Sequence, residues 1–183
     1  MIYMSIHSAI GDRVSEGRLF PLTHTLGFPE TRRMLVSNEV TALVNGPWES
    51  NSWEARCMGL RASLDRFLDG TIVQVGMPDP ALPYERKPKA FFRLLHPAYD
   101  QVWEIRDLHK NPKLSLRVFG RFADVDLFIA LGWQSRDKLG KPTSSAWRDA
   151  RVACKTAWTN LFYVYPPQIG TNLHDYISNA VPV

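Results

Sequence analysis

Arginine side chains, the groups best suited to hold a phosphate, gather in one stretch of the sequence. Arg106 ends the segment VWEIR, and Arg117 and Arg121 lie in the segment SLRVFGRF. A guanidinium is always charged, and its planar fork of N–H groups matches a phosphate or a carboxylate. If neighbouring strands carry these side chains, several guanidiniums meet on one face of a sheet. The pattern therefore favours an anionic ligand, and Glu104 is the carboxylate that stands within VWEIR.

The basic charge is concentrated in one block of the chain. Residues 86–155 carry 15 Lys and Arg against 7 Asp and Glu, whereas residues 1–85 carry 7 against 10. This asymmetry is typical of a surface for nucleic acid or for an acidic protein, although a solvated face without a partner has the same composition. Two basic loops in this block supply candidate contacts to such a partner, namely Lys87, Lys89, Arg136, Lys138 and Lys141.

Three consecutive antiparallel strands are predicted to position the arginines. Val102–Leu108 and Leu114–Phe122 alternate between two kinds of side chain, which is typical of half-buried strands. Val125–Trp133 is apolar almost throughout, so we expect it at the centre of a sheet that is covered on both faces. Arg117 and Arg121 alternate onto one face of the second strand.

Helices and further strands are expected on both sides of this stretch. Trp53–Asp69 and Ala146–Phe162 repeat apolar residues at helical spacing. Further strands are expected at Val40–Val44, Thr71–Met77 and Ala90–Leu95. In the N-terminal residues before Val40, glycines and prolines interrupt the chain so often that only brief strands or turns are expected. The last helix is predicted to share its core with the apolar strand through Phe128, Ile129, Leu131, Trp147, Ala150, Ala153 and Trp158. We therefore predict an α+β domain with a twisted, mainly antiparallel sheet of about four to six strands and two principal helices.

The order of these elements and two short motifs resemble the RelE/ParE superfamily of small toxins and their phage-borne relatives. In that family a strand ending in aromatic-x-[IL]-[KR] precedes a strand of the form [YL]-R-[VL]-[FY], then an apolar strand and a loop rich in Lys and Arg. Here VWEIR, SLRVFGRF, DLFIALGW and QSRDKLGKP occupy those places. The resemblance covers roughly Trp53 to Phe162. It implies an N-terminal extension at 1–50, a domain at 51–165 and a tail at 166–183.

The ribonuclease branch of this family implies cleavage without a metal. Basic side chains hold the scissile phosphate, while a base takes the proton of the RNA 2′-hydroxyl so that this oxygen attacks phosphorus. Arg106 and Arg117 match family positions that hold phosphate, and Arg121 is available to assist. Glu104 replaces a basic residue of that branch. It is either the base, because a carboxylate flanked by arginines stays ionised, or a structural partner of Arg106.

Other positions of that branch have only substitutes here. Gln134 stands about where the branch has an arginine, and its nearest basic neighbours are Arg136, Lys138 and Lys141. Further candidates for the acid or base are His109 and His174.

Two classes of function follow from the resemblance. The first is a metal-independent endoribonuclease that cuts RNA on the ribosome or as free message. The second is a non-catalytic protein on the same scaffold, ParE-like or a phage-encoded inhibitor, that blocks a host enzyme or nucleoprotein complex. It would use the basic face with Trp133, Trp103 or the tail tyrosines. The clustered arginines favour the first class, and the incomplete catalytic set favours the second. A toxin of either kind implies an antitoxin partner.

Composition narrows the setting. With 183 residues, 45% of them hydrophobic and 22% charged, the chain is long and apolar enough to fold around a core. It contains neither an apolar run of membrane-spanning length nor a signal-peptide pattern, so we expect a cytoplasmic protein without a membrane partner. Cys57 and Cys154 are predicted to be buried free thiols. No metal-binding or cofactor-binding motif is present.

Overall fold

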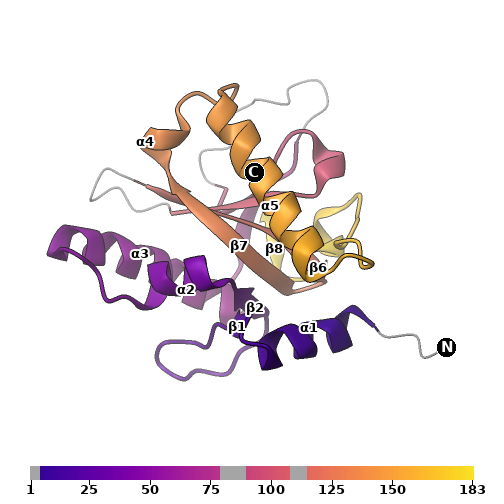
Figure 1. Cartoon of the computed structure of the whole chain (residues 1–183), viewed down its shortest axis with the longest axis horizontal. Coiled ribbons are helices and arrows are strands. Elements are labelled where there is room, and N and C mark those ends of the chain that lie inside the picture. Colours follow the sequence, from indigo (N-terminus) through magenta and orange to yellow (C-terminus); the bar gives the residue numbers. More distant parts are fainter. Residues whose placement is uncertain (1–4, 79–89, 108–114) are drawn as a thin grey trace.

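The computed structural model has three layers, with one mixed sheet between helices (Figure 1). It describes residues 5–78, 90–107 and 115–183. Helix α5 (Ser145–Leu161) lies on one face of the sheet, and helices α2 (Asn38–Asn45) and α3 (Asn51–Leu68) lie on the other. Within the described ranges, no helix is long and apolar enough to cross a membrane.

In the described part of the chain, eight strands form the sheet, in the order β1-β2-β7-β6-β5-β4-β3-β8. Strands β4 to β7 pair antiparallel in succession, whereas β2 pairs parallel with β7, and β3 pairs parallel with both β4 and β8. The sheet thus joins segments from the start, the middle and the end of the chain. The strand bounds are β1 Phe20–Pro21, β2 Arg33–Val36, β3 Val73–Gly76, β4 Phe92–Leu94, β5 Trp103–Arg106, β6 Leu116–Asp124, β7 Leu127–Ser135 and β8 Ala180–Pro182.

The remaining helical elements are short. Helix α1 (Ile6–Ser15) packs beside the end of α5, where the Arg13 guanidinium donates to the carbonyl oxygen of Leu161 over 2.9 Å. Helix α4 (Arg136–Leu139) follows β7 directly, and 3-10 turns occupy Ala98–Asp100 and Leu173–Asp175. Serines cap the first three helices, because the hydroxyls of Ser5, Ser37 and Ser50 accept backbone N–H groups of α1, α2 and α3.

The prediction of a mainly antiparallel sheet of four to six strands with two principal helices is wrong. The sheet is mixed and has eight strands, because residues outside the range 51–165 extend it at both ends. Strands β1 and β2 come from the expected N-terminal extension, and β8 comes from the expected tail. Parallel pairing occurs within 51–165, between β3 and β4, and the additions extend it, since β2 and β8 run alongside strands of the same direction.

The N-terminal prediction is also wrong in its local detail. The segment Val40–Val44, expected to be a strand, lies within helix α2, and residues expected to form only brief strands or turns include helix α1. In α2 the buried residues Val40, Leu43 and Val44 follow helical spacing, and the Ser37 hydroxyl caps the first turn. A short apolar run fits both a strand and a helix, and here the cap decides.

The core is divided by the sheet into two parts. Phe128 contacts the rings of Phe92 and Phe122 on the α2 and α3 side, whereas Ile129, its neighbour in sequence, packs on the α5 side. The predicted shared core with α5 is therefore wrong for Phe128, because successive side chains of a strand point to opposite faces. It is also wrong for Ala153, which is exposed on α5.

Candidate functional site

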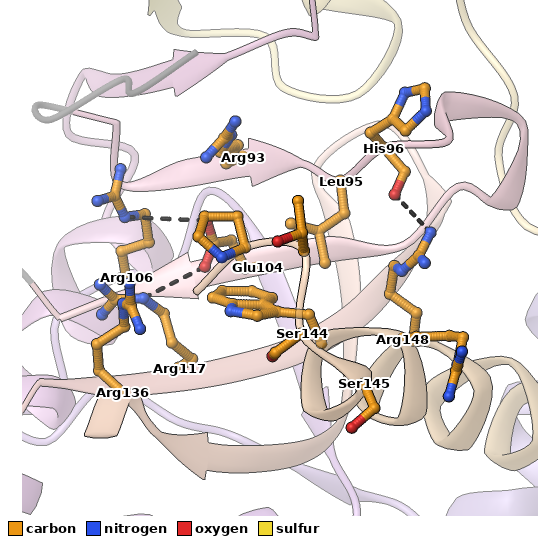
Figure 2. A pocket seen from close by; sticks show the side chains of 14 residues that line it. Arg93, Leu95, His96, Glu104, Arg106, Arg117, Arg136, Ser144, Ser145 and Arg148 are labelled. Carbon is orange, nitrogen blue, oxygen red and sulfur yellow. Dashed lines mark hydrogen bonds and ion pairs between the residues drawn. The ribbon is translucent and has the colours of Figure 1, made fainter. Parts of the chain in front are cut away.

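A cavity of about 530 Å³ lies between the sheet and the N-terminal end of α5. It is lined by strand residues, by the segment from α4 to α5 and by the first two turns of α5. We call it the arginine pocket after its charged lining, which is made of Arg93, Arg106, Arg117, Arg136, Arg148, Arg151 and Glu104. Figure 2 shows the side chains of Arg106, Arg117 and Arg136 close to Glu104.

Strand alternation sets the floor of the arginine pocket. On β5, Trp103 and Ile105 point into the core under α2 and α3, so Glu104 and Arg106 point to the α5 side. In the ladder, Glu104 pairs with Arg93 of β4, and Arg106 pairs with Arg117 of β6. Pairing of neighbouring strands thus brings together charges that are far apart in the sequence.

Glu104 holds the two guanidiniums of the floor. Its side chain is only 2% exposed, and one carboxylate oxygen, Oε2, lies 3.2 Å from Nε of Arg117. Its Oε1 lies 3.9 Å from Nε of Arg106. Two like charges directly opposite each other on adjacent strands destabilise a sheet. The carboxylate near both guanidiniums offsets this repulsion.

Burial shifts the pKa values of both partners of the closest pair. Removal from water raises the pKa of Glu104, and the nearby guanidiniums of Arg117 and Arg106 oppose this rise. Burial also lowers the pKa of Arg117 to about 10, while Glu104 opposes the decrease. Arg117 therefore stays charged at neutral pH. Glu104 holds its proton to a higher pH than an ordinary glutamate does.

The rim of the pocket carries more accessible arginines. The Arg136 guanidinium carbon lies 5.8 Å from the centre of the Trp147 ring, and the guanidinium donates to the Gly140 carbonyl oxygen. Arg148 is exposed, with its Nε 3.5 Å from a carboxylate oxygen of Asp149. Such a pair is weak in water, so the Arg148 guanidinium can reorient toward a ligand.

One predicted arginine lies elsewhere. Arg121 is on the same face of β6 as Arg117, but Phe119 lies between them and packs edge to face on Trp147. Arg121 instead lies under α5, with its guanidinium 5.5 Å from the Trp158 ring, and its Nε donates to the Gln101 carbonyl oxygen over 3.4 Å. It does not line the arginine pocket, because α5 covers it.

The remaining candidate contacts are scattered. Lys138 and Lys141 are exposed on α4 and the loop after it, beside the pocket. Trp133 packs on Trp53 and lines a different groove, between β7 and α5. Trp103 is fully buried, which contradicts its predicted role at an exposed binding face.

Three predicted positions lie outside the described residues, namely Lys87, Lys89 and His109. His174 lies in the 3-10 turn of the tail, where its Nδ1 is 3.3 Å from the carbonyl oxygen of Ile177, and it does not line the pocket. Across the described part of the chain, no group of three His, Cys, Asp or Glu residues could hold a metal ion.

Sequence reasoning missed about half of the arginine pocket. Arg93 is the single charged residue in the apolar segment FFRLL, and an isolated charge in an apolar strand indicates a candidate site residue. Arg148 and Arg151 are three residues apart at the start of α5, just after the basic loop, and so share one face of the helix. Trp147 was assigned to the core alone, yet it also lines the pocket.

No protein-family model, curated protein or solved structure matches this chain. The resemblance to RelE/ParE toxins therefore stays a prediction from short motifs. The function is therefore inferred from the geometry of the arginine pocket.

Proposed function

We propose that the protein binds RNA by its phosphate groups in the arginine pocket. The observation that carries this proposal is the charge of the lining: among the residues that the structure describes, six arginines and one glutamate line the pocket, with a summed charge of +5 when these seven are ionised. Guanidiniums bind phosphate oxygens through paired N–H groups, and a partly enclosed pocket strengthens these contacts. We expect this binding to take place in the cytoplasm.

A polymer fits the surroundings of the pocket better than an isolated small anion does. The exposed Lys138 and Lys141 lie on the same segment that brings Arg136 and Ser144 to the pocket. Positive charge therefore continues from the cavity onto the surface. A chain with one phosphate in the pocket can place its next phosphates beside these lysines.

A second candidate, metal-independent cleavage of the bound RNA, is favoured by the position of Glu104. Its carboxyl group lies at the floor of the pocket, and burial moves its pKa upward. In this reaction the carboxylate takes the 2′-hydroxyl proton, the 2′-oxygen bonds to phosphorus, and the bond to the 5′-oxygen breaks. The leaving 5′-oxygen takes a proton from water, and Glu104 returns its proton to the solvent. Arg106 and Arg117 stabilise the charge on the phosphate. The products are a 2′,3′-cyclic phosphate and a 5′-hydroxyl.

The binding proposal is tested with a labelled, short single-stranded RNA and fluorescence anisotropy. We expect the Arg136→Gln/Arg148→Gln double variant to bind more weakly, by about 1.5–3 kcal/mol for each charged contact that is lost. Arg66→Gln is the matched control, because Arg66 is exposed on α3 across the sheet. Arg117 is unsuitable for this test, since its loss leaves Glu104 buried without its closest partner.

Salt dependence gives an independent measurement. For single strands, the logarithm of the binding constant falls against the logarithm of salt concentration by about 0.7 for each phosphate neutralised. Equal affinity of the double variant and the wild type, or binding that is indifferent to salt, would contradict the proposal.

Cleavage is tested by incubating the RNA with wild type and Glu104→Gln in EDTA. We expect cyclic phosphate ends from the wild type, and intact RNA that is still bound by Glu104→Gln. Cleavage by Glu104→Gln at the wild-type rate would remove Glu104 from the mechanism. Uncut RNA with the wild type would leave binding as the function.

A further inference from the structure

The N-terminus of α5 opens onto the arginine pocket without a capping side chain. Ser144 is at the cap position but makes no capping hydrogen bond, because its hydroxyl donates to the Leu139 carbonyl oxygen over 2.5 Å. The first turn of α5 contains no acidic residue. Ser144 and Ser145 line the pocket, and Figure 2 shows both at the start of this helix. The partial positive charge of a long helix is thus directed at the cavity.

The wall of the same pocket also contains a buried donor without a partner. Trp147 lines the pocket and is 8% exposed, yet its indole N–H has no hydrogen-bond partner among the residues that the structure describes. A buried N–H group without an acceptor is costly, so native structures rarely leave one unmatched. A ligand with acceptor oxygens that enters the pocket beside Trp147 would supply a partner for this group.

The pocket is bounded at one end. The Arg151 guanidinium donates to the carbonyl oxygen of His96, and this hydrogen bond spans from α5 to the segment after β4. The volume of about 530 Å³ lies in the range of pockets that enclose one small molecule, so it suits a single terminal nucleotide rather than an extended strand. A chain end enters such a cavity more easily than the middle of a strand passes through it.

Charge also distinguishes a chain end from an internal position. A phosphate monoester carries about −1.5 to −2 at pH 7, because its second pKa is about 6, whereas each internal phosphodiester carries a single charge. Asp100 pairs with Arg151, and Asp149 pairs with Arg148. After these two carboxylates and Glu104 are subtracted, the six arginines of the described lining still offer more positive charge than one diester can neutralise. A terminal phosphate uses this charge more fully.

We propose that the start of α5, with Arg136, Arg148 and the Trp147 indole N–H, forms a subsite for a terminal phosphate monoester. This inference rests on the proposed RNA binding and names the part of the RNA that is bound, a phosphorylated chain end. A free nucleotide carries the same chemical group, so the experiment has to separate the two sources.

The experiment compares the affinities of one short RNA sequence made with a 5′-phosphate, a 3′-phosphate or only hydroxyl ends. A nucleoside monophosphate and inorganic phosphate serve as competitors. We expect one phosphorylated end to bind about tenfold tighter, or more, than the hydroxyl form. Arg148→Gln and Trp147→Phe should each reduce the preference, and Arg66→Gln should not.

Each outcome separates this inference from the proposed function. If all three RNAs bind equally well, the terminal subsite is refuted while RNA binding stands. If the monophosphate binds and hydroxyl-ended RNA does not, the subsite stands and its ligand is the free nucleotide, so the RNA proposal fails. If no phosphate monoester binds or competes, the subsite is wrong. Trp147→Phe keeps the ring in the core, and exposed Arg148 gives a readout that does not depend on core packing.

Discussion

Gly120 lies on β6 where the neighbouring strand β7 leaves no room for a side chain, and replacing it with alanine tests this packing. It pairs with Ala130 of β7 at an irregularity in the ladder, next to Phe119, which packs on Trp147 of the pocket wall. A methyl group built on Gly120 would meet the backbone oxygen of Ile129 and come within 2.5 Å of the Phe128 ring. Neither neighbour can move away easily, because Ile129 belongs to the ladder and Phe128 is fully buried.

The expected cost of Gly120→Ala lies at the upper end of the range for overpacked cores, about 3 kcal/mol. In a chain of this length, each kcal/mol lost from the free energy of unfolding lowers the melting temperature by about 2–4 °C, so Tm should fall by about 6–12 °C. Thermal unfolding followed by circular dichroism measures this change. RNA affinity should fall as well, since Phe119 moves with the strand.

Gly11→Ala is the matched control, and its expected change in stability has the opposite sign. Gly11 lies in helix α1, and a methyl group there meets no atom within 4 Å. Alanine is the better helix former by about 1 kcal/mol, so this variant should be more stable than the wild type. If Gly120→Ala melts like the wild type while Gly11→Ala shifts as expected, β6 and β7 do not approach as closely as described and the reasoning is wrong.

Two further predictions concern the core. Phe128→Ala should cost about 3–5 kcal/mol in a urea melt, because the ring is fully buried against Phe92 and Phe122, and a loss below about 1 kcal/mol would contradict this packing. Burial raises the pKa of Cys57 to about 11 and that of Cys154 to about 12, so a thiol reagent at pH 8 should label both only after denaturation. Rapid labelling of the native protein would show the thiols to be accessible. The thiols of the unfolded protein ionise at a lower pH than the buried ones, so the free energy of unfolding should decrease as the pH rises from about 9 toward these values.

The sequence determined the elements whose side-chain pattern is long and regular. Strands β5, β6 and β7 and helices α3 and α5 begin and end within two residues of the bounds expected from alternation and helical spacing. The two-residue period of a strand and the 3.6-residue period of a helix are local properties of the chain, so they can be recognised without knowing which elements pack together. The short apolar run Val40–Val44 carries too few residues to separate these periods, and its helix came from the cap at Ser37.

The sequence also indicated the floor of the candidate site, because alternation alone places Glu104 and Arg106 on one face of β5. Only the tertiary structure decided which other arginines join them. Docking of α5 across the sheet brings Arg148 and Arg151 to the pocket and, by the same contact, covers Arg121. The pairing of β2 with β7 and of β8 with β3 was equally out of reach, since a strand's partner depends on contacts between residues far apart in the chain. Local pattern determines which way a side chain points, and only packing determines what it meets there.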